Sequence, residues 1–360
     1  MTSQSTTYPL AGFSTEFNRF VKRCRDSGID FSGMQRAHAV EMSLGEAASP
    51  QSTRFAGEDQ ILRIEGPIEA RKIPKSASAS KLRYFLDGAQ QTLPAGRLGH
   101  VPAYLSITSA GIVERDDNGT CTLVPGTLKI QSCWLVPEGI DSDHTRFICD
   151  GLREMGIAIV DPLASYAGNR ERYLRAASDY VHIESQALAA TNHERSKLEE
   201  DLLGQWERTL SDGEQWIVVD GQLRRPVANA VGLVKSFTYQ YVTGDEATAL
   251  FSLPAGQRSS AFIAENQYRS EPKERALWYL RFHNSEGLDA RHGLIRLEAA
   301  PDVVDSDRID ELSAWLLAER APRASSDARW DSLIYPIHLL ERMLKRKLSE
   351  VTLAWPGARR

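Results

Sequence analysis

Residues 217–223 read IVVDGQL, an apolar run that leads to Asp220 and then to a glycine. Trp216 extends the run, so WIVV is continuously apolar, as expected for an interior strand covered on both faces. An aspartate at the carboxyl end of such a strand lies where α/β sheets bind ligands. The stretch FLDGAQQT at 85–92 repeats the pattern with Asp87. We expect each strand to end at its aspartate and to turn at the glycine, so two carboxylates meet if the strands are neighbours.

The segments on either side of IVVDGQL alternate between strand and helix patterns. Residues 169–210 contain no proline and one glycine, which predicts a long helix with at most one break. The other segments are strand-like at 82–87, 100–116, 121–136, 229–237, 276–283 and 293–300, and helical at 306–319 and 336–348. This order predicts an α/β fold with a mixed sheet flanked by helices.

Composition restricts the class of protein. The 360-residue chain is 42% hydrophobic with a net charge of −5, which predicts a globular protein without a global attraction to nucleic acid or acidic membranes. The first fifteen residues lack the basic start and apolar core of a secretory signal, and no apolar run approaches the length of a membrane span. We therefore expect a cytoplasmic protein that does not engage a membrane. The four cysteines lack zinc-site spacing and are expected to be free thiols.

Two carboxylates in a partly buried place repel each other, so they require a shared proton or a cation between them. A shared proton would suggest an aspartic protease, built on two Asp-Thr/Ser-Gly elements. The elements here read DGA and DGQ, and the long helical segment between them fits a β-lobed protease badly. A divalent cation such as Mn²⁺ or Mg²⁺ fits better, because these ions prefer oxygen ligands, and such a site usually needs a third carboxylate.

The helix before Asp220 offers one inward-facing carboxylate. Its apolar face is made by Leu198, Leu202, Leu203, Trp206 and Leu210. With Leu198 at zero on a helical projection, Glu199 falls at about 100°, in the middle of that face. An ionised glutamate there requires a compensating charge, which is either the cation or an arginine or lysine in an ion pair. The sequence leaves both alternatives open.

A lysine follows a comparable strand. The segment AVGLV at 230–234 delivers Lys235 at its end, as VV delivers Asp220. In a hairpin or an adjacent strand, Lys235 could approach the carboxylates and hold a phosphate or stabilise developing negative charge. The alternative is a surface lysine whose stem lies along apolar neighbours.

Taken in order, these motifs resemble the NurA-type nuclease family. The matching stretches are LDG at 86–88, IVVDGQL, AVGLVKS at 230–236, LPAGQRSSAFI at 253–263, ALWYLRFH at 276–283 and GLIRLEAA at 293–300. The resemblance covers roughly residues 80–345 and rests on the order of short motifs. It implies an RNase H-like fold, Mn²⁺-dependent (or Mg²⁺-dependent) cleavage of DNA, and function beside a HerA-type hexameric ATPase that translocates DNA. Members usually read D-G-S at both aspartates, whereas this chain has Ala89 and Gln222, which removes a hydroxyl and leaves the ligands.

The resemblance assigns roles to individual residues. By matching motifs, Asp87 and Asp220 would be metal ligands, with Lys235 and His338 as further catalytic residues. Glu199 would be the family's helix glutamate and a third ligand, selected by its place on the helical face. His338 is the nearest counterpart of a family histidine, although its helical position points away from the stripe of neighbouring leucines.

The reaction that follows is metal-assisted phosphodiester hydrolysis. The candidate phosphate contacts are Arg97, Arg224 and Arg225, although arginines after a strand are also ordinary surface residues. Glu298 could join the site or cap a strand end.

Two other functions stay open. The chain could be a catalytically silent interaction subunit of such an ATPase, although the retained carboxylates argue against this, or another metal-dependent phosphoryl hydrolase. We expect a nuclease domain at 81–350 and an N-terminal extension at 1–80 that forms a docking or homodimer contact, with a connector at 73–81.

Overall fold

The computed structural model describes residues 13–29, 60–74, 79–140, 142–235, 239–265, 274–285, 290–320, 332–353 and 355. The helices are α1 (Phe13–Asp26), α3 (Asp143–Glu154), α4 (Arg170–Ala177), α5 (Tyr180–Thr209), α6 (Gly244–Phe251), α7 (Ser306–Glu319) and α8 (Tyr335–Thr352), with 3-10 turns at Ala164–Tyr166 and Pro301–Val303. The strands are β1 (Gln60–Arg63), β2 (Ala70–Lys72), β3 (Leu82–Leu98), β4 (Val101–Arg115), β5 (Cys121–Leu123), β6 (Lys129–Leu135), β7 (Ile159–Val160), β8 (Trp216–Asp220), β9 (Ala230–Val234), β10 (Gln257–Ser259), β11 (Phe262–Glu265), β12 (Ala276–Arg281) and β13 (Leu294–Ala299).

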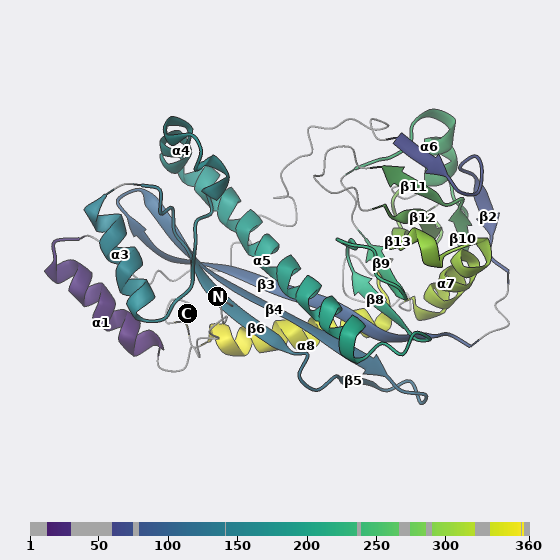
Figure 1. Ribbon diagram of the computed structural model, residues 1–360, viewed down its shortest axis with the longest axis horizontal. Coiled ribbons are helices and arrows are strands. Elements are labelled where there is room, and N and C mark those ends of the chain that lie inside the picture. Colours follow the sequence, from purple (N-terminus) through teal and green to yellow (C-terminus); the bar gives the residue numbers. More distant parts are fainter. Residues whose placement is uncertain are drawn as a thin grey trace.

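Within the described residues, thirteen strands form one mixed sheet flanked by helices (Figure 1). The main order is β1-β11-β12-β13-β9-β8-β3-β4-β6-β7, with β10 beside β12 and β2, and β5 beside β4. Strands β3, β8 and β9 are parallel neighbours, whereas β4, β6 and β13 join them in antiparallel pairs. The predicted α/β class with a mixed sheet is confirmed.

Strands β3 and β8 are neighbours, which the sequence had left as a condition, and their register fixes the two aspartates. Leu86 lies opposite Val219 in the parallel pair, so Asp87 and Asp220 are the next residues on adjacent strands. Strand β8 is buried over its four apolar residues, as the unbroken WIVV run predicts for an interior strand. The interior position of β8 is therefore confirmed, and the structure supplies its pairing with β3.

Different helices cover the two faces of the central strands. On one face Leu86 and Val219 pack with Leu198 and Leu202 of α5. On the other face, Phe85 packs in the cluster that contains the leucines of α8. Both helices run along the long strands β3 and β4 (Figure 1). The predicted break in the helical segment is also observed, because α4 ends at Ala177 and Asp179 caps α5 by accepting a hydrogen bond from the His182 backbone N–H.

The expectation that β3 ends at Asp87 was wrong. The strand continues to Leu98 and stays paired with β4 throughout. Gly88 is therefore not a turn residue. A Cβ at Gly88 would overlap the carboxylate of Glu199 and lie 3.0 Å from the Arg195 Cγ, so glycine permits α5 to approach the strand closely. Gly221 does turn the chain after Asp220, at a φ of 110° that favours glycine.

The described parts of the first 80 residues are built into the same sheet and core. Strands β1 and β2 pair with β11 and β10. On α1, the Phe17 ring lies 5.1 Å from the Trp134 ring and 5.2 Å from the Trp355 ring. Among the described residues, β1, β2 and α1 thus share the sheet and core of the expected domain at 81–350. Residues 75–78 of the expected connector lie outside the described residues.

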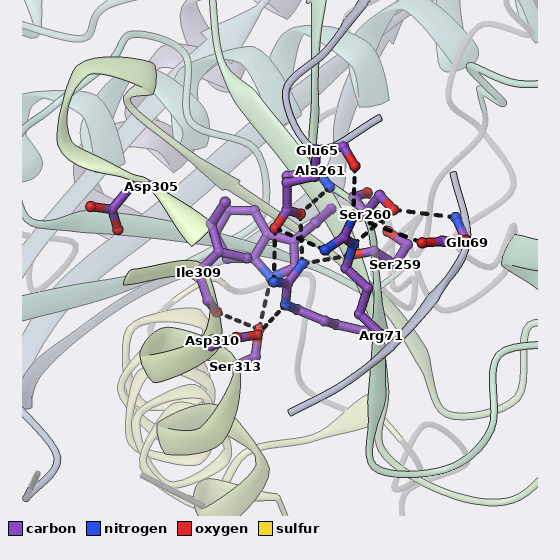
Figure 2. Close-up of polar contacts among 12 residues, drawn as sticks. Glu65, Glu69, Arg71, Ser259, Ser260, Ala261, Asp305, Ile309, Asp310 and Ser313 are labelled. Carbon is purple, nitrogen blue, oxygen red and sulfur yellow. Dashed lines mark hydrogen bonds and ion pairs between the residues drawn. The ribbon is translucent and has the colours of Figure 1, made fainter. Parts of the chain in front are cut away.

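A buried ion cluster attaches the segment between β1 and β2 to the sheet (Figure 2). Arg258 of β10 donates to Glu65 through Nη1 at 2.7 Å and Nη2 at 2.9 Å, and its Nε donates to Asp310 of α7 at 2.5 Å. The side chains of Arg258 and Glu65 are each 2% exposed. Removing one partner would leave a buried charge uncompensated, at a cost of about 3–5 kcal/mol.

In the described part of the chain, none of the helices combines the length and apolar character needed to cross a membrane.

Candidate functional site

Asp87 is buried in the middle of β3 and faces α8. Its cross-strand partner is Gly111, and a Cβ on Gly111 would lie 3.5 Å from both Leu340 and Leu344 of α8. Directly opposed residues point to the same face of a sheet, so Asp87 points toward the same helix. The residue is 3% exposed, and among the described residues its Oδ2 atom has no hydrogen-bond partner. A buried carboxylate oxygen without a donor is costly, which marks the position as a candidate for chemistry.

Asp220 and Lys235 form an ion pair beside Asp87. Asp220 ends β8, and Lys235 follows β9, the parallel neighbour of β8. The Lys235 Nζ donates to the Asp220 Oδ2 at 2.8 Å, and the two side chains are 6% and 20% exposed. The proximity that the strand ends suggested is therefore observed. A buried ammonium group lies where the cation of the sequence argument was expected.

The charges of this cluster shift the pKa values of its members. Burial and then the charge of Asp220 raise the pKa of Asp87 well above its ordinary value, against the opposing charge of Lys235. Burial lowers the pKa of Lys235, but the charges of Asp220 and Asp87 outweigh it and raise that pKa above its ordinary value. One lysine therefore lies beside more than one carboxylate, and the ionised form of Asp87 is the one that stays disfavoured.

A carboxylate that the sequence argument missed also faces this cluster. Glu341 of α8 is 9% exposed and forms an ion pair with Lys345 at 2.7 Å. Its charge contributes to the raised pKa values of Asp87 and Lys235. The signal was available, because Glu341 lies three residues before Leu344 and four after Ile337, at the edge of the buried stripe of the helix. Glu199 was selected because it falls in the middle of its apolar face, so finding Glu341 would have required the same projection with residues at the edge of the stripe included.

Glu199 lies on the opposite face of β3 from Asp87. Its carboxylate packs against Gly88, and successive side chains of a strand alternate between faces. Glu199 forms an ion pair with Arg195, and Arg195 also donates to Gln90 at 3.0 Å and to Asn192 at 2.9 Å. Burial raises the pKa of Glu199 to about 6, with Arg195 opposing and the charge of Asp220 adding to the shift. Of the two partners that the sequence left open for Glu199, the structure shows the ion pair with an arginine. The charge of Glu199 still interacts with that of Asp220.

The other predicted residues lie at different distances from the cluster. His338 is half-buried one turn before Glu341, and its Nδ1 has no hydrogen-bond partner among the described residues. Arg97 is exposed ten residues beyond Asp87 on the continuous strand β3, roughly 30 Å away at about 3.3 Å per residue. It is therefore remote from Asp87, because β3 does not turn where the sequence suggested. Arg225 pairs with Glu207 of α5 at 2.6 Å.

The donor types of the site suit a divalent metal ion. Carboxylate oxygens are the ligands that Mn²⁺ and Mg²⁺ prefer, and the Oδ2 of Asp87 has no competing donor. Across the ranges that the structure describes, however, no three His, Cys, Asp or Glu side chains are grouped as around a metal ion. Lys235 and Arg195 each hold a carboxylate instead. The oxygen donors of the site therefore suit a divalent ion by their chemistry, although they are not grouped around one. Asp87, Asp220 and Glu341 are the carboxylates that share one face of the sheet.

No protein-family model matches this chain, and no curated protein matches it significantly.

Proposed function

We propose that this chain is a metal-dependent nuclease that hydrolyses DNA phosphodiester bonds on an RNase H-like core. The observation that carries the proposal is a buried Asp87 and a half-buried Asp220 on adjacent parallel strands, with an unpartnered oxygen on Asp87 and a lysine against Asp220. Structural ion pairs rarely leave a buried carboxylate oxygen without a donor. The central order β6-β4-β3-β8-β9, with β3, β8 and β9 parallel, supports the fold that the motif resemblance implies.

The chain's own groups divide into ligands and charge partners. Asp87 and Asp220 would hold the ion, with Glu341 or Glu199 as a third carboxylate. When bound, Mn²⁺ or Mg²⁺ supplies Lewis-acid chemistry at a phosphodiester. Lys235, which lies against Asp220, would hold a phosphate oxygen and stabilise negative charge that develops there. His338 lies one turn before Glu341 on α8, so its side chain would lie on the same side of the helix as Glu341.

The partner proposal rests on the resemblance and on charge. A net charge of −5 provides little intrinsic attraction for DNA, so a HerA-type ring ATPase that delivers the strand would compensate for weak binding. A homodimer in the cytoplasm would fit such a ring. Cleavage by the isolated chain would then be weak and sensitive to salt.

One observation favours a second candidate, a silent interaction subunit. Lys235 and Arg195 already compensate Asp220 and Glu199 without a metal ion. A protein that had lost catalysis could retain the fold with these pairs alone.

One set of assays separates the candidates. The purified chain is incubated with single-stranded DNA, double-stranded DNA and a phosphate monoester, each with Mn²⁺, with Mg²⁺ and with EDTA. A nuclease cuts DNA with metal and loses this activity in Asp87→Asn and Asp220→Asn, whereas Asp201→Asn, exposed on α5, retains it. Hydrolysis of the monoester alone indicates another phosphoryl hydrolase. Absence of both activities together with absence of Mn²⁺ binding by calorimetry indicates the silent subunit.

A further inference from the structure

The loop that follows Asp220 is held by a buried carboxylate from a distant strand. Leu223 donates its backbone N–H to the Glu298 Oε2 at 3.1 Å, and its carbonyl accepts from the Arg275 Nη1 at 2.7 Å. Glu298 belongs to β13, and Arg275 immediately precedes β12. Both main-chain polar groups of the buried Leu223 are thus bound by side chains that lie far away in the sequence.

The network around Glu298 is compact and charged. Its Oε2 accepts from Arg275 at 2.7 Å, and its Oε1 accepts from the Arg296 Nη2 at 2.9 Å and Nε at 3.1 Å. The side chain of Glu298 is 0% exposed, against 9% and 1% for Arg275 and Arg296. A fully bonded polar network in a low-dielectric interior is rigid and specifies a single geometry. The loop therefore takes its position from this network.

A glycine on strand β9 leaves room for the backbone of the loop. Gly232 lies opposite Glu298 in the β9–β13 pair. A Cβ at Gly232 would lie 2.8 Å from the Gly221 carbonyl oxygen and 3.1 Å from the Leu223 backbone nitrogen. Any side chain at this position would push the loop away, so Gly232 and Glu298 act on the same segment from the same side.

The loop ends in two consecutive arginines, and their side chains lie in different environments. Arg225 pairs with Glu207 of α5 at 2.6 Å. Arg224 is exposed and, in the part of the chain that the structure describes, has no hydrogen-bond or ion-pair partner, although its charge acts on Glu199. An unpaired guanidinium four residues after Asp220 presents five donors in a fork that matches a phosphate.

We propose that Glu298 is a positioning residue that fixes the loop 221–225 and thereby sets the place where Arg224 binds a backbone phosphate of the substrate. This inference rests on the proposed nuclease function and adds a phosphate subsite to it. The guanidinium is presented by a loop that is already ordered, so binding does not require the loop to become ordered first.

The test measures the binding of a labelled single-stranded oligonucleotide in EDTA by fluorescence anisotropy, between about 50 and 200 mM salt. One phosphate contact contributes about 0.7 to the slope of log K against log salt on single strands. Arg224→Ala is expected to reduce the slope by about this amount. Glu298→Gln should do the same, and should cause no further reduction in the Arg224→Ala background. Arg175→Ala removes an exposed charge on α4 and serves as the matched control.

Because Glu298→Gln leaves two buried arginines without their carboxylate and could fail to fold, Gly232→Ala tests the same point without changing charge. It too should reduce the slope, by displacing the loop. A wild-type slope in folded Gly232→Ala or Glu298→Gln would overturn the inference, as would additive losses in the double variant. If these variants keep the wild-type slope while the wild type cuts DNA in a parallel assay with Mn²⁺, only the positioning role fails. If the wild type neither binds nor cuts DNA, the proposed function fails and the inference fails with it.

Discussion

The Glu199→Gln variant tests how the helix carboxylate is compensated. In the metal-free protein, burial raises the pKa of Glu199 from 4.5 to about 6 despite the ion pair with Arg195. The folded state therefore binds the proton more tightly than the unfolded state. The resulting stabilisation is fully present below pH 4.5 and is lost as the pH rises through about 6. Glutamine resembles the protonated acid and does not titrate, so the variant lacks this loss.

The magnitude follows from the two pKa values. The interval from 4.5 to about 6, at about 1.4 kcal/mol for each pH unit, corresponds to about 2 kcal/mol. We expect the wild type to lose about 2 kcal/mol of unfolding free energy relative to Glu199→Gln between pH 4.5 and 7.5. Arg195 adds little to this difference, because it keeps its bonds to Gln90 and Asn192 and is 23% exposed.

The assay is urea unfolding of both proteins with EDTA at the two pH values, followed by the same experiment with Mn²⁺ at the higher pH. Asp201→Asn on the exposed side of α5 should follow the wild type at both pH values. A difference that stays constant with pH, or that favours the wild type at high pH, would refute the reasoning, since the Arg195 ion pair would then dominate over burial. Equal Mn²⁺ stabilisation of both proteins would separately exclude Glu199 as a ligand.

Three further predictions concern the same region. Asp87→Asn should raise the metal-free unfolding free energy by about 1 kcal/mol in urea at neutral pH, because it removes a buried carboxyl group whose pKa is raised. A loss of stability in this variant would contradict the prediction. Glu341→Gln should weaken Mn²⁺ binding about tenfold or more by calorimetry, with His338→Ala as the side-by-side comparison, and an unchanged affinity would remove Glu341 from the ligand set. Gly88→Ala should lower the unfolding free energy by about 1–3 kcal/mol because its Cβ meets the Glu199 carboxylate, whereas Gly168→Ala, with open space around it, should not.

The interior position of β8 could be predicted because it depends on local signals, since an unbroken apolar run identifies an interior strand wherever it occurs. Its pairing with β3 stayed a condition at the level of the sequence, because strand order depends on contacts between distant segments. The register of Leu86 against Val219 then places Asp87 beside Asp220. Lys235 follows by the same logic, since β9 continues the parallel set.

The length of β3 and the pairing of β1 and β2 into the main sheet could not be predicted. A glycine after an aspartate has the same local appearance in a turn and in a strand that a helix approaches closely. Only the presence of α5 against Gly88 distinguishes the two cases. Strands β1 and β2 are four and three residues long, too short for a periodic pattern, and they exist through their pairing with β11 and β10.

The interior strands, the long helical segment, and the places of Asp220 and Lys235 at strand ends could be inferred from local sequence, because hydrophobic periodicity is a property of neighbouring residues. Which carboxylates share a face depends on the packing of the helices on the sheet. Glu199 and Glu341 occupy comparable places on the buried stripes of their helices, yet α5 and α8 cover opposite faces of β3. The side from which a helix covers a sheet depends on contacts between segments that are far apart in the chain. Asp87 therefore faces Glu341, while Glu199 pairs with Arg195 across the strand.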